Sequence, residues 1–82
     1  MKSKVSRWIR GYDKATELLA VEYPLSEQWT LPELKALFGA ASDDEMFGCF
    51  PIGIAEASQL TQRMDRQVDW NAYNYFLEAD AQ

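Results

Sequence analysis

Few residues in this chain are of a type that could do chemistry, and they form no catalytic pattern. The sequence has no histidine, which removes the commonest general base and the commonest metal ligand. Its single cysteine, Cys49, lies between Gly48 and Phe50 in an apolar run, and we expect a buried, inert thiol there. A zinc site needs several cysteine or histidine ligands. The sequence therefore predicts no enzyme, no metal site and no cofactor.

The acidic run Asp43-Asp44-Glu45 is the densest group of possible oxygen ligands. Its spacing differs from that of a calcium-binding loop, in which ligands recur at alternate positions around a glycine. We expect an exposed, solvated loop here, with a protein-contact loop as the alternative.

Aromatic residues make up 13% of the chain, and they are the second candidate for function. Tyrosine and tryptophan carry much of the binding energy of protein interfaces, especially beside charged groups, although any single ring can instead fill the core. Two non-helical stretches that combine acidic and aromatic residues supply the predicted partner-binding set. Its members are Asp43, Asp44, Glu45, Asp69, Trp70 and Tyr73.

The segment 5–23 predicts a β-hairpin. Its first half has the two-residue alternation of a strand, and its second half, 18–23, is apolar and partly β-branched. Pro24 ends the second strand because it lacks the N–H that a ladder needs. Between the strands lies a polar turn, 13–16, in which the side chain of Asp13 can accept backbone N–H bonds.

A helix between Thr30 and Gly39 is the clearest local signal. Thr30 and Glu33 have the spacing of a capping box, and Pro32 lies in the first turn, where its missing N–H costs little. Gly39 is a typical residue just after a helix C-terminus.

The second half of the chain predicts a short strand, a helix and a final strand. The segment 46–52 is at best a short edge strand, because a glycine and a proline interrupt it. Apolar residues at helical spacing predict a second helix over 54–66. The segment 73–78 has strand composition, but a third helix over 70–79 fits the aromatic spacing and remains an alternative.

These elements follow the order β-β-α-(β)-α-β. They predict a single α+β domain, residues 1–82, with a small antiparallel sheet and two helices packed on one face. The strand period divides the side chains of the last strand between two faces, with Tyr73, Tyr75 and Leu77 on one and Asn74, Phe76 and Glu78 on the other. If the helices cover one face only, some aromatic surface faces solvent or a partner.

Charge is distributed unevenly along the chain. Eight basic and thirteen acidic residues give a net charge of −5, with +4 in the first 14 residues and −9 in the rest. An acidic surface repels phosphate and attracts basic proteins, so we expect a protein partner and no nucleic acid. No apolar stretch approaches the ~20 residues of a membrane span or suggests a signal peptide. A cytoplasmic location without a membrane partner is the expectation.

Several segments resemble a family of small uncharacterised bacterial proteins. They are Arg10-Gly11-Tyr12-Asp13-Lys14-Ala15-Thr16-Glu17-Leu18-Leu19, Glu22-Tyr23-Pro24-Leu25, Leu34 to Gly39, Asp43-Asp44-Glu45-Met46 through Phe50-Pro51-Ile52, and Tyr73-Asn74-Tyr75-Phe76-Leu77-Glu78. Such small acidic proteins resemble immunity proteins, which neutralise a toxin delivered by contact-dependent inhibition, Rhs or type VI systems. That resemblance implies a basic toxin domain as the partner and carries no residue-level site.

Three functional hypotheses follow. The first is an immunity protein that neutralises its cognate toxin by direct contact. The second is another interaction module, either a homodimer or an adaptor for a different protein. The third, an enzyme or small-molecule sensor, requires a pocket lined by carboxylates of raised pKa.

Overall fold

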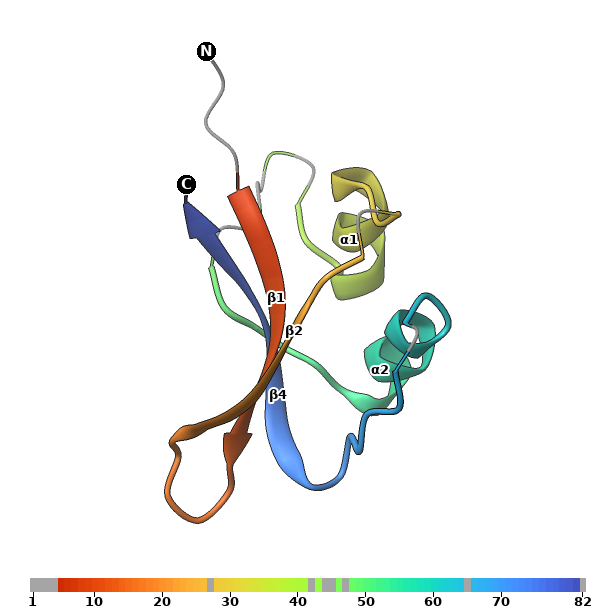
Figure 1. Ribbon diagram of the computed structural model, residues 1–82. Helices are drawn as coiled ribbons and strands as arrows, with labels where there is room; N and C mark the ends of the chain where they lie inside the picture. Colours follow the sequence, from red (N-terminus) through yellow and green to blue (C-terminus); the bar gives the residue numbers. More distant parts are fainter. Residues whose placement is uncertain are drawn as a thin grey trace.

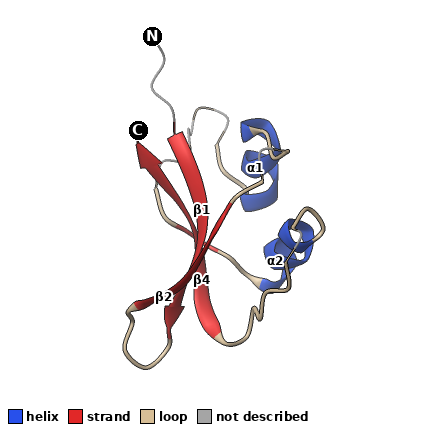
Figure 2. Cartoon of the chain, in the orientation of Figure 1, coloured by secondary structure: helices blue, strands red, loops and turns tan. Residues whose placement is uncertain are grey.

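The two ends of the chain form the central pair of strands in a four-stranded antiparallel sheet (Figure 1). The computed structural model describes residues 5–26, 28–41, 43, 46, 48–64 and 66–81. Its elements are β1 (Val5–Asp13), β2 (Leu19–Pro24), α1 (Leu31–Phe38), β3 (Phe50–Pro51), α2 (Ile54–Thr61) and β4 (Tyr73–Ala81). The strand order is β2-β1-β4-β3, and both helices lie on the same side of the sheet (Figure 2). This is the predicted α+β architecture and element order.

The core lies between the sheet and the two helices. Ile9 of β1 and Leu77 of β4 are paired across the two central strands, and both are buried. Leu34 of α1 and Leu60 of α2 close the core from the other side, and Met46 joins it from the loop before β3. Each helix therefore contributes only a narrow apolar stripe, as expected of short amphipathic helices on a small sheet.

The hairpin that joins β1 to β2 forms where the sequence predicts it. Asp13 Oδ1 accepts hydrogen bonds from the backbone N–H groups of Ala15 and Thr16, at 2.8 and 3.0 Å. Glu17, which follows, adopts a left-handed conformation with φ of 63°. Pro24 is the last residue of β2, and Leu25 N still donates to Arg7 O at 2.9 Å.

Helix α1 is capped as its sequence predicts. Glu33 N donates to Thr30 Oγ1, and Thr30 N donates to a carboxylate oxygen of Glu33, which completes the capping box. Gly39 ends the helix in a left-handed conformation with φ of 67°. Arg63 then links the two helical segments, because its guanidinium lies 2.7 Å from Glu33 Oε2 and 4.2 Å from the centre of the Trp29 ring.

Helix α2 is shorter than the predicted 54–66. It ends at Thr61, after which Arg63 N and Met64 N bond to carbonyls three residues back and tighten the last turn. Trp70 Nε1 donates to Thr61 Oγ1 at 2.7 Å, so the returning chain packs against the end of the helix. Ile54, an apolar residue at the first helical position, is 85% exposed and does not join the core.

The alternative of a third helix over 70–79 is wrong. Residues 73–81 pair with β1 along its whole length, from Asp13 opposite Tyr73 to Val5 opposite Ala81. That ladder satisfies the backbone of β4 and places alternate residues Tyr75 and Leu77 in the core, a spacing that a helix cannot produce. The β3 strand, in contrast, has only the two residues that the interrupted sequence allows.

Two side chains lie close to the Cα atom of Gly11, and replacing this glycine with alanine should destabilise the fold. A Cβ atom there would lie 2.7 Å from both Tyr75 Cε1 and Val21 Cγ2. We expect Gly11→Ala to lower the free energy of unfolding by about 1–3 kcal/mol, the usual cost of overpacking. Urea denaturation followed by tryptophan fluorescence measures it. Gly48→Ala is the matched control because its Cβ would meet nothing within 4 Å; equal stability of the two variants would contradict the packing argument.

Candidate functional site

The face of the sheet opposite the helices carries an aromatic and charged surface, which we call the open face. Alternation along the strands places it opposite the buried Ile9 and Leu77. Both helices lie on the other side in Figure 1. Its side chains are Trp8, Arg10 and Tyr12 of β1, Glu22 of β2, and Phe76, Glu78 and Asp80 of β4.

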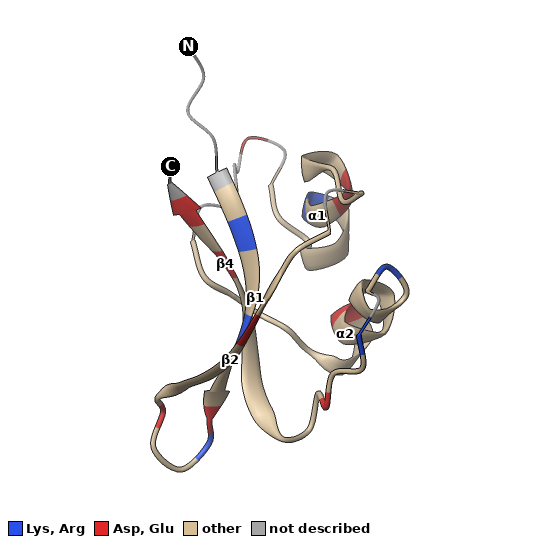
Figure 3. Ribbon diagram, in the orientation of Figure 1, with Lys and Arg blue, Asp and Glu red and all other residues tan. Residues whose placement is uncertain are grey.

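Arg10 is the centre of the open face and contacts three carboxylates from both neighbouring strands. Its Nε atom lies 3.0 Å from Glu22 Oε2, its Nη1 atom 3.0 Å from Glu78 Oε1, and its Nη2 atom 2.6 Å from Asp80 Oδ2. Figure 3 shows the acidic segments of β2 and β4 beside the basic segment of β1. The single positive charge of Arg10 is thus paired with three carboxylates, and the four side chains together have a net charge of −2.

The contacts within the network favour the charged forms of Arg10, Glu78 and Asp80. Hydrogen bonds to Asp80 and then Glu78 raise the pKa of Arg10 further above its usual value, and Arg10 in turn lowers the pKa of Asp80. Burial acts to raise the pKa of Glu78, but hydrogen bonds from Tyr12 and Arg10 outweigh it, so this pKa is lowered as well. The side chains of Glu22 and Asp80 remain 45% and 49% exposed, which leaves their charge accessible to a partner.

Aromatic rings surround this charged cluster. The Tyr12 and Phe76 rings meet edge to face, with centroids 5.8 Å apart and planes at 71°. The Arg10 guanidinium lies 5.6 Å from the centre of the Trp8 ring. Tyr12 also donates its hydroxyl to Glu78 Oε2 at 2.7 Å, and this bond raises the pKa of Tyr12 to about 12. The open face therefore combines aromatic rings and an arginine, residue types enriched at the centres of protein interfaces, with three carboxylates.

The prediction that Cys49 is buried is wrong. Cys49 is exposed, because β3 begins only at Phe50. Phe50 is paired with Leu77 on the helix-covered side, which leaves its neighbour outside the core. The thiol lies 3.7 Å from Glu78 Oε2; local desolvation and this carboxylate raise its pKa. A raised pKa makes Cys49 a poor nucleophile.

The structure does not gather the predicted partner-binding residues into one site. Asp43 is exposed in the loop between α1 and β3, whereas Asp44 and Glu45 lie outside the described residues. In Figure 1 the described part of that loop lies toward the chain termini, and the segment that leads into β4 lies at the other end of the sheet. The acidic loop and the segment with Asp69, Trp70 and Tyr73 are thus separate.

Trp70 and Tyr73 are half-buried and support the core. The ring centroid of Trp70 lies 4.9 Å from that of the buried Tyr75, and the ring centroid of Tyr73 lies 6.1 Å from that of Tyr75. Asp69 is exposed, and its Oδ1 accepts a hydrogen bond from Asn71 N in a local turn. Asp69 and Trp70 also line a shallow groove of about 880 Å³ between α2 and the segment before β4.

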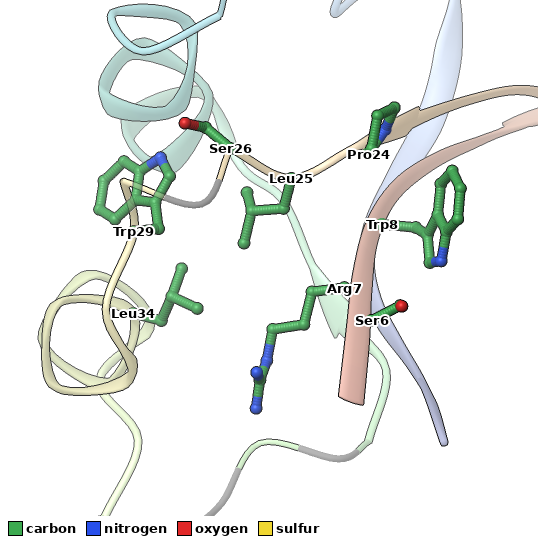
Figure 4. A pocket seen from close by; sticks show the side chains of 8 residues that line it. All are labelled: Ser6, Arg7, Trp8, Pro24, Leu25, Ser26, Trp29 and Leu34. Atoms are coloured by element: carbon green, nitrogen blue, oxygen red, sulfur yellow. The ribbon is translucent and has the colours of Figure 1, made fainter. Parts of the chain in front are cut away.

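A smaller hollow of about 280 Å³ lies at the edge of the sheet beyond the end of β2. Figure 4 shows Arg7 and Trp8 leaving β1 on opposite sides, with Arg7 directed toward Leu34. Leu25 and Trp29 contribute further apolar lining, so this hollow is largely an extension of the core edge. Among the described residues, no group of three cysteine and acidic side chains is arranged to hold a metal ion.

Sequence reasoning missed the Arg10 network, although part of its signal was present. Alternation in the last strand places Phe76 and Glu78 on the face away from Tyr75. The missing information was the register, because only the pairing of Trp8 with Glu78 and of Arg10 with Glu22 brings the charges together.

The sequence matches one protein family over most of its length. A family described as a domain of unknown function, DUF7683, matches residues 6–78. The chain belongs to this family. The match begins within β1 and ends within β4, so it covers all or most of each described strand and helix. Comparisons with curated proteins and with solved structures found no match. In the described part of the chain, no helix is both long enough and apolar enough to cross a membrane.

Replacement of Arg10 by methionine should destabilise the protein in a pH-dependent manner. The pKa values of Glu78 and Asp80 are lower in the folded state than in the unfolded state, where they are about 4. Ionisation of these two groups therefore stabilises the fold above pH ~4, and this contribution is lost as the pH falls through their folded-state pKa values. Without Arg10 the carboxylates repel one another while ionised. We therefore expect Arg10→Met to lose more stability relative to the wild type at pH ~7 than at pH ~3.

Urea denaturation at both pH values measures this difference. Arg66→Met is the control, because Arg66 is exposed and its described contact is with the Tyr23 ring, 6.0 Å away. An equal loss of stability at both pH values for Arg10→Met would mean that packing, not charge, explains the role of Arg10.

Proposed function

We propose that this chain is a protein-binding domain that uses its open face to bind a basic partner. The observation that carries the proposal is the Arg10 network, a cluster of net charge −2 bordered by Trp8, Tyr12 and Phe76 on a sheet face that neither helix covers. Aromatic residues are typical anchors at interface centres, and the accessible carboxylates beside them complement the charge of a basic partner.

The total surface of the chain is large enough for such an interface. A standard interface buries about 800 Å² on each partner, and the chain has a total accessible surface of 5701 Å². A contact of that size would occupy about one seventh of this surface. The acidic excess would accelerate association with a basic protein and make it sensitive to salt.

The specific form of this proposal is an immunity protein that acts in the cytoplasm and neutralises a basic toxin domain. Its support is the net charge of −5 together with the resemblance of the sequence to small acidic immunity proteins. Asp43, Asp44, Glu45 and Asp69 remain predicted contributors to the contact. In this function the protein performs no chemistry, and neutralisation results from occupation of the toxin surface.

A homodimeric module is the second candidate, and the edge strand β2 favours it. β2 ends the sheet on one side, and Leu18 and Leu19 beside the hairpin are 69% and 49% exposed. An exposed edge with apolar residues can pair with another strand.

The test is capture of the partner from native cell extract with the tagged protein, followed by mass spectrometry. We expect a basic protein in near-stoichiometric amount, released by salt. The variant Glu22→Gln/Asp80→Asn keeps the shape of the open face but removes two charges, and should recover much less of it. Glu56→Gln, on α2, is the matched control. Asp43→Lys/Asp44→Lys tests the acidic loop separately.

The captured protein then decides between the two candidates. Its expression should arrest growth of susceptible cells, and co-expression of this chain should restore growth. A captured protein without toxicity would contradict the immunity form of the proposal. Recovery of the tagged chain alone, running as a dimer, would contradict the basic-partner proposal and favour the homodimer.

A further inference from the structure

A pocket of about 310 Å³ lies at the hairpin end of the open face. Its apolar part consists of the Tyr12 and Phe76 rings, which meet edge to face. The remaining lining consists of Asp13, Glu17, Cys49, Asn74 and Glu78. Two aromatic rings with three carboxylates and no basic residue in the lining form an environment suited to a positive charge.

Two of the three carboxylates already have partners within the fold. Glu78 accepts hydrogen bonds from Tyr12 and Arg10, at 2.7 and 3.0 Å. Asp13 Oδ1 accepts the two backbone N–H groups of the hairpin turn. These bonds fix the positions of both groups but leave their negative charge in place.

Glu17 differs from the other two. Its side chain is exposed and forms no hydrogen bond or ion pair with any residue that the structure describes. Its backbone N–H is tied to Asp13 O at 2.8 Å, and its φ of 63° is uncommon for a residue with a side chain. The turn thus places an uncommitted carboxylate at the rim of a pocket that contains aromatic rings.

The nearby basic residues do not fill the pocket. Lys14 lies next to Asp13 in the turn, but its Nζ donates to Asn71 O at 2.8 Å. Arg10 contacts Glu78 and is surrounded by two further carboxylates, Glu22 and Asp80. The charge balance around the pocket therefore remains negative, and the missing partner is a cation.

We propose that this pocket accepts an arginine side chain of the protein partner, packed against the Tyr12 and Phe76 rings and paired with Glu17. The inference rests on the proposed function, since it identifies one contact of the basic partner. Arginine fits better than lysine because its planar guanidinium stacks on aromatic faces and forms two parallel bonds to a carboxylate.

The experiment uses a small probe, so that it does not depend on the identity of the partner. N-acetyl-arginine methylamide is titrated into the ¹⁵N-labelled full chain and followed by NMR, with the uncharged N-acetyl-citrulline methylamide as the matched probe. We expect saturable shifts of Tyr12, Glu17 and Phe76 with the arginine probe, at dissociation constants of about millimolar, and none with the citrulline probe.

Variants test the two halves of the pocket. Glu17→Gln and Phe76→Leu should each weaken binding of the arginine probe roughly threefold to fivefold, the effect of losing one exposed charge or cation–π contact. Glu56→Gln should have no effect, because Glu56 lies on α2 and its carboxylate accepts Gly53 N at 2.9 Å.

Two outcomes would overturn the inference. One is an absence of saturable shifts at the pocket, and the other is an equal response to the citrulline probe. The proposed function fails separately: if a basic partner is captured but the arginine probe does not bind, the pocket assignment is wrong and the function stands. If the probe binds as expected and no partner is captured, the ligand chemistry of the pocket stands and the proposed function is wrong.

Discussion

Pairing of β1 with β4 joins the two ends of the chain over nine consecutive residue pairs, and the rest of the structure depends on it. This ladder places Ile9 beside Leu77 at the centre of the core, and it gives α1 and α2 a common apolar surface to cover. Because its contacts span nearly the whole sequence, loop closure must occur before they stabilise anything. The same pairing requires a glycine at position 11, because the Tyr75 ring of β4 packs where a side chain at that position would lie.

The same pairing creates the open face. A strand that places Ile9 in the core must place Arg10 on the opposite side, and the register sets Arg10 beside Phe76 and near Glu78 and Asp80. Both helices lie on the same side of the sheet, so neither covers the charged and aromatic side chains of the other face. The proposed binding function is thus a consequence of how the small core is built.

Much of the fold could be predicted from the sequence, because its signals are local. The capping box at Thr30, the Asp13 turn and the strand-ending Pro24 each depend on residues only a few positions apart. The end of α2 and the exposure of Cys49 could not be predicted in this way. They depend on contacts with distant residues, because Trp70 packs against the end of α2 and Phe50 pairs with Leu77 of β4. The candidate site was missed for the same reason: its charges come from three strands, and only the register brings them together.

Hydroxyl-radical labelling of the tagged chain tests the central claim, that the open face is the binding surface, most directly. The chain is labelled free and while bound to the protein captured from its native extract, and labelling of each side chain is read by mass spectrometry. The account predicts that Trp8, Tyr12 and Phe76 lose reactivity in the complex, while Trp29 and Met64, which pack against the core on the helix-covered side, keep theirs. Protection of Trp29 and Met64 with unchanged labelling of the three open-face rings would contradict it.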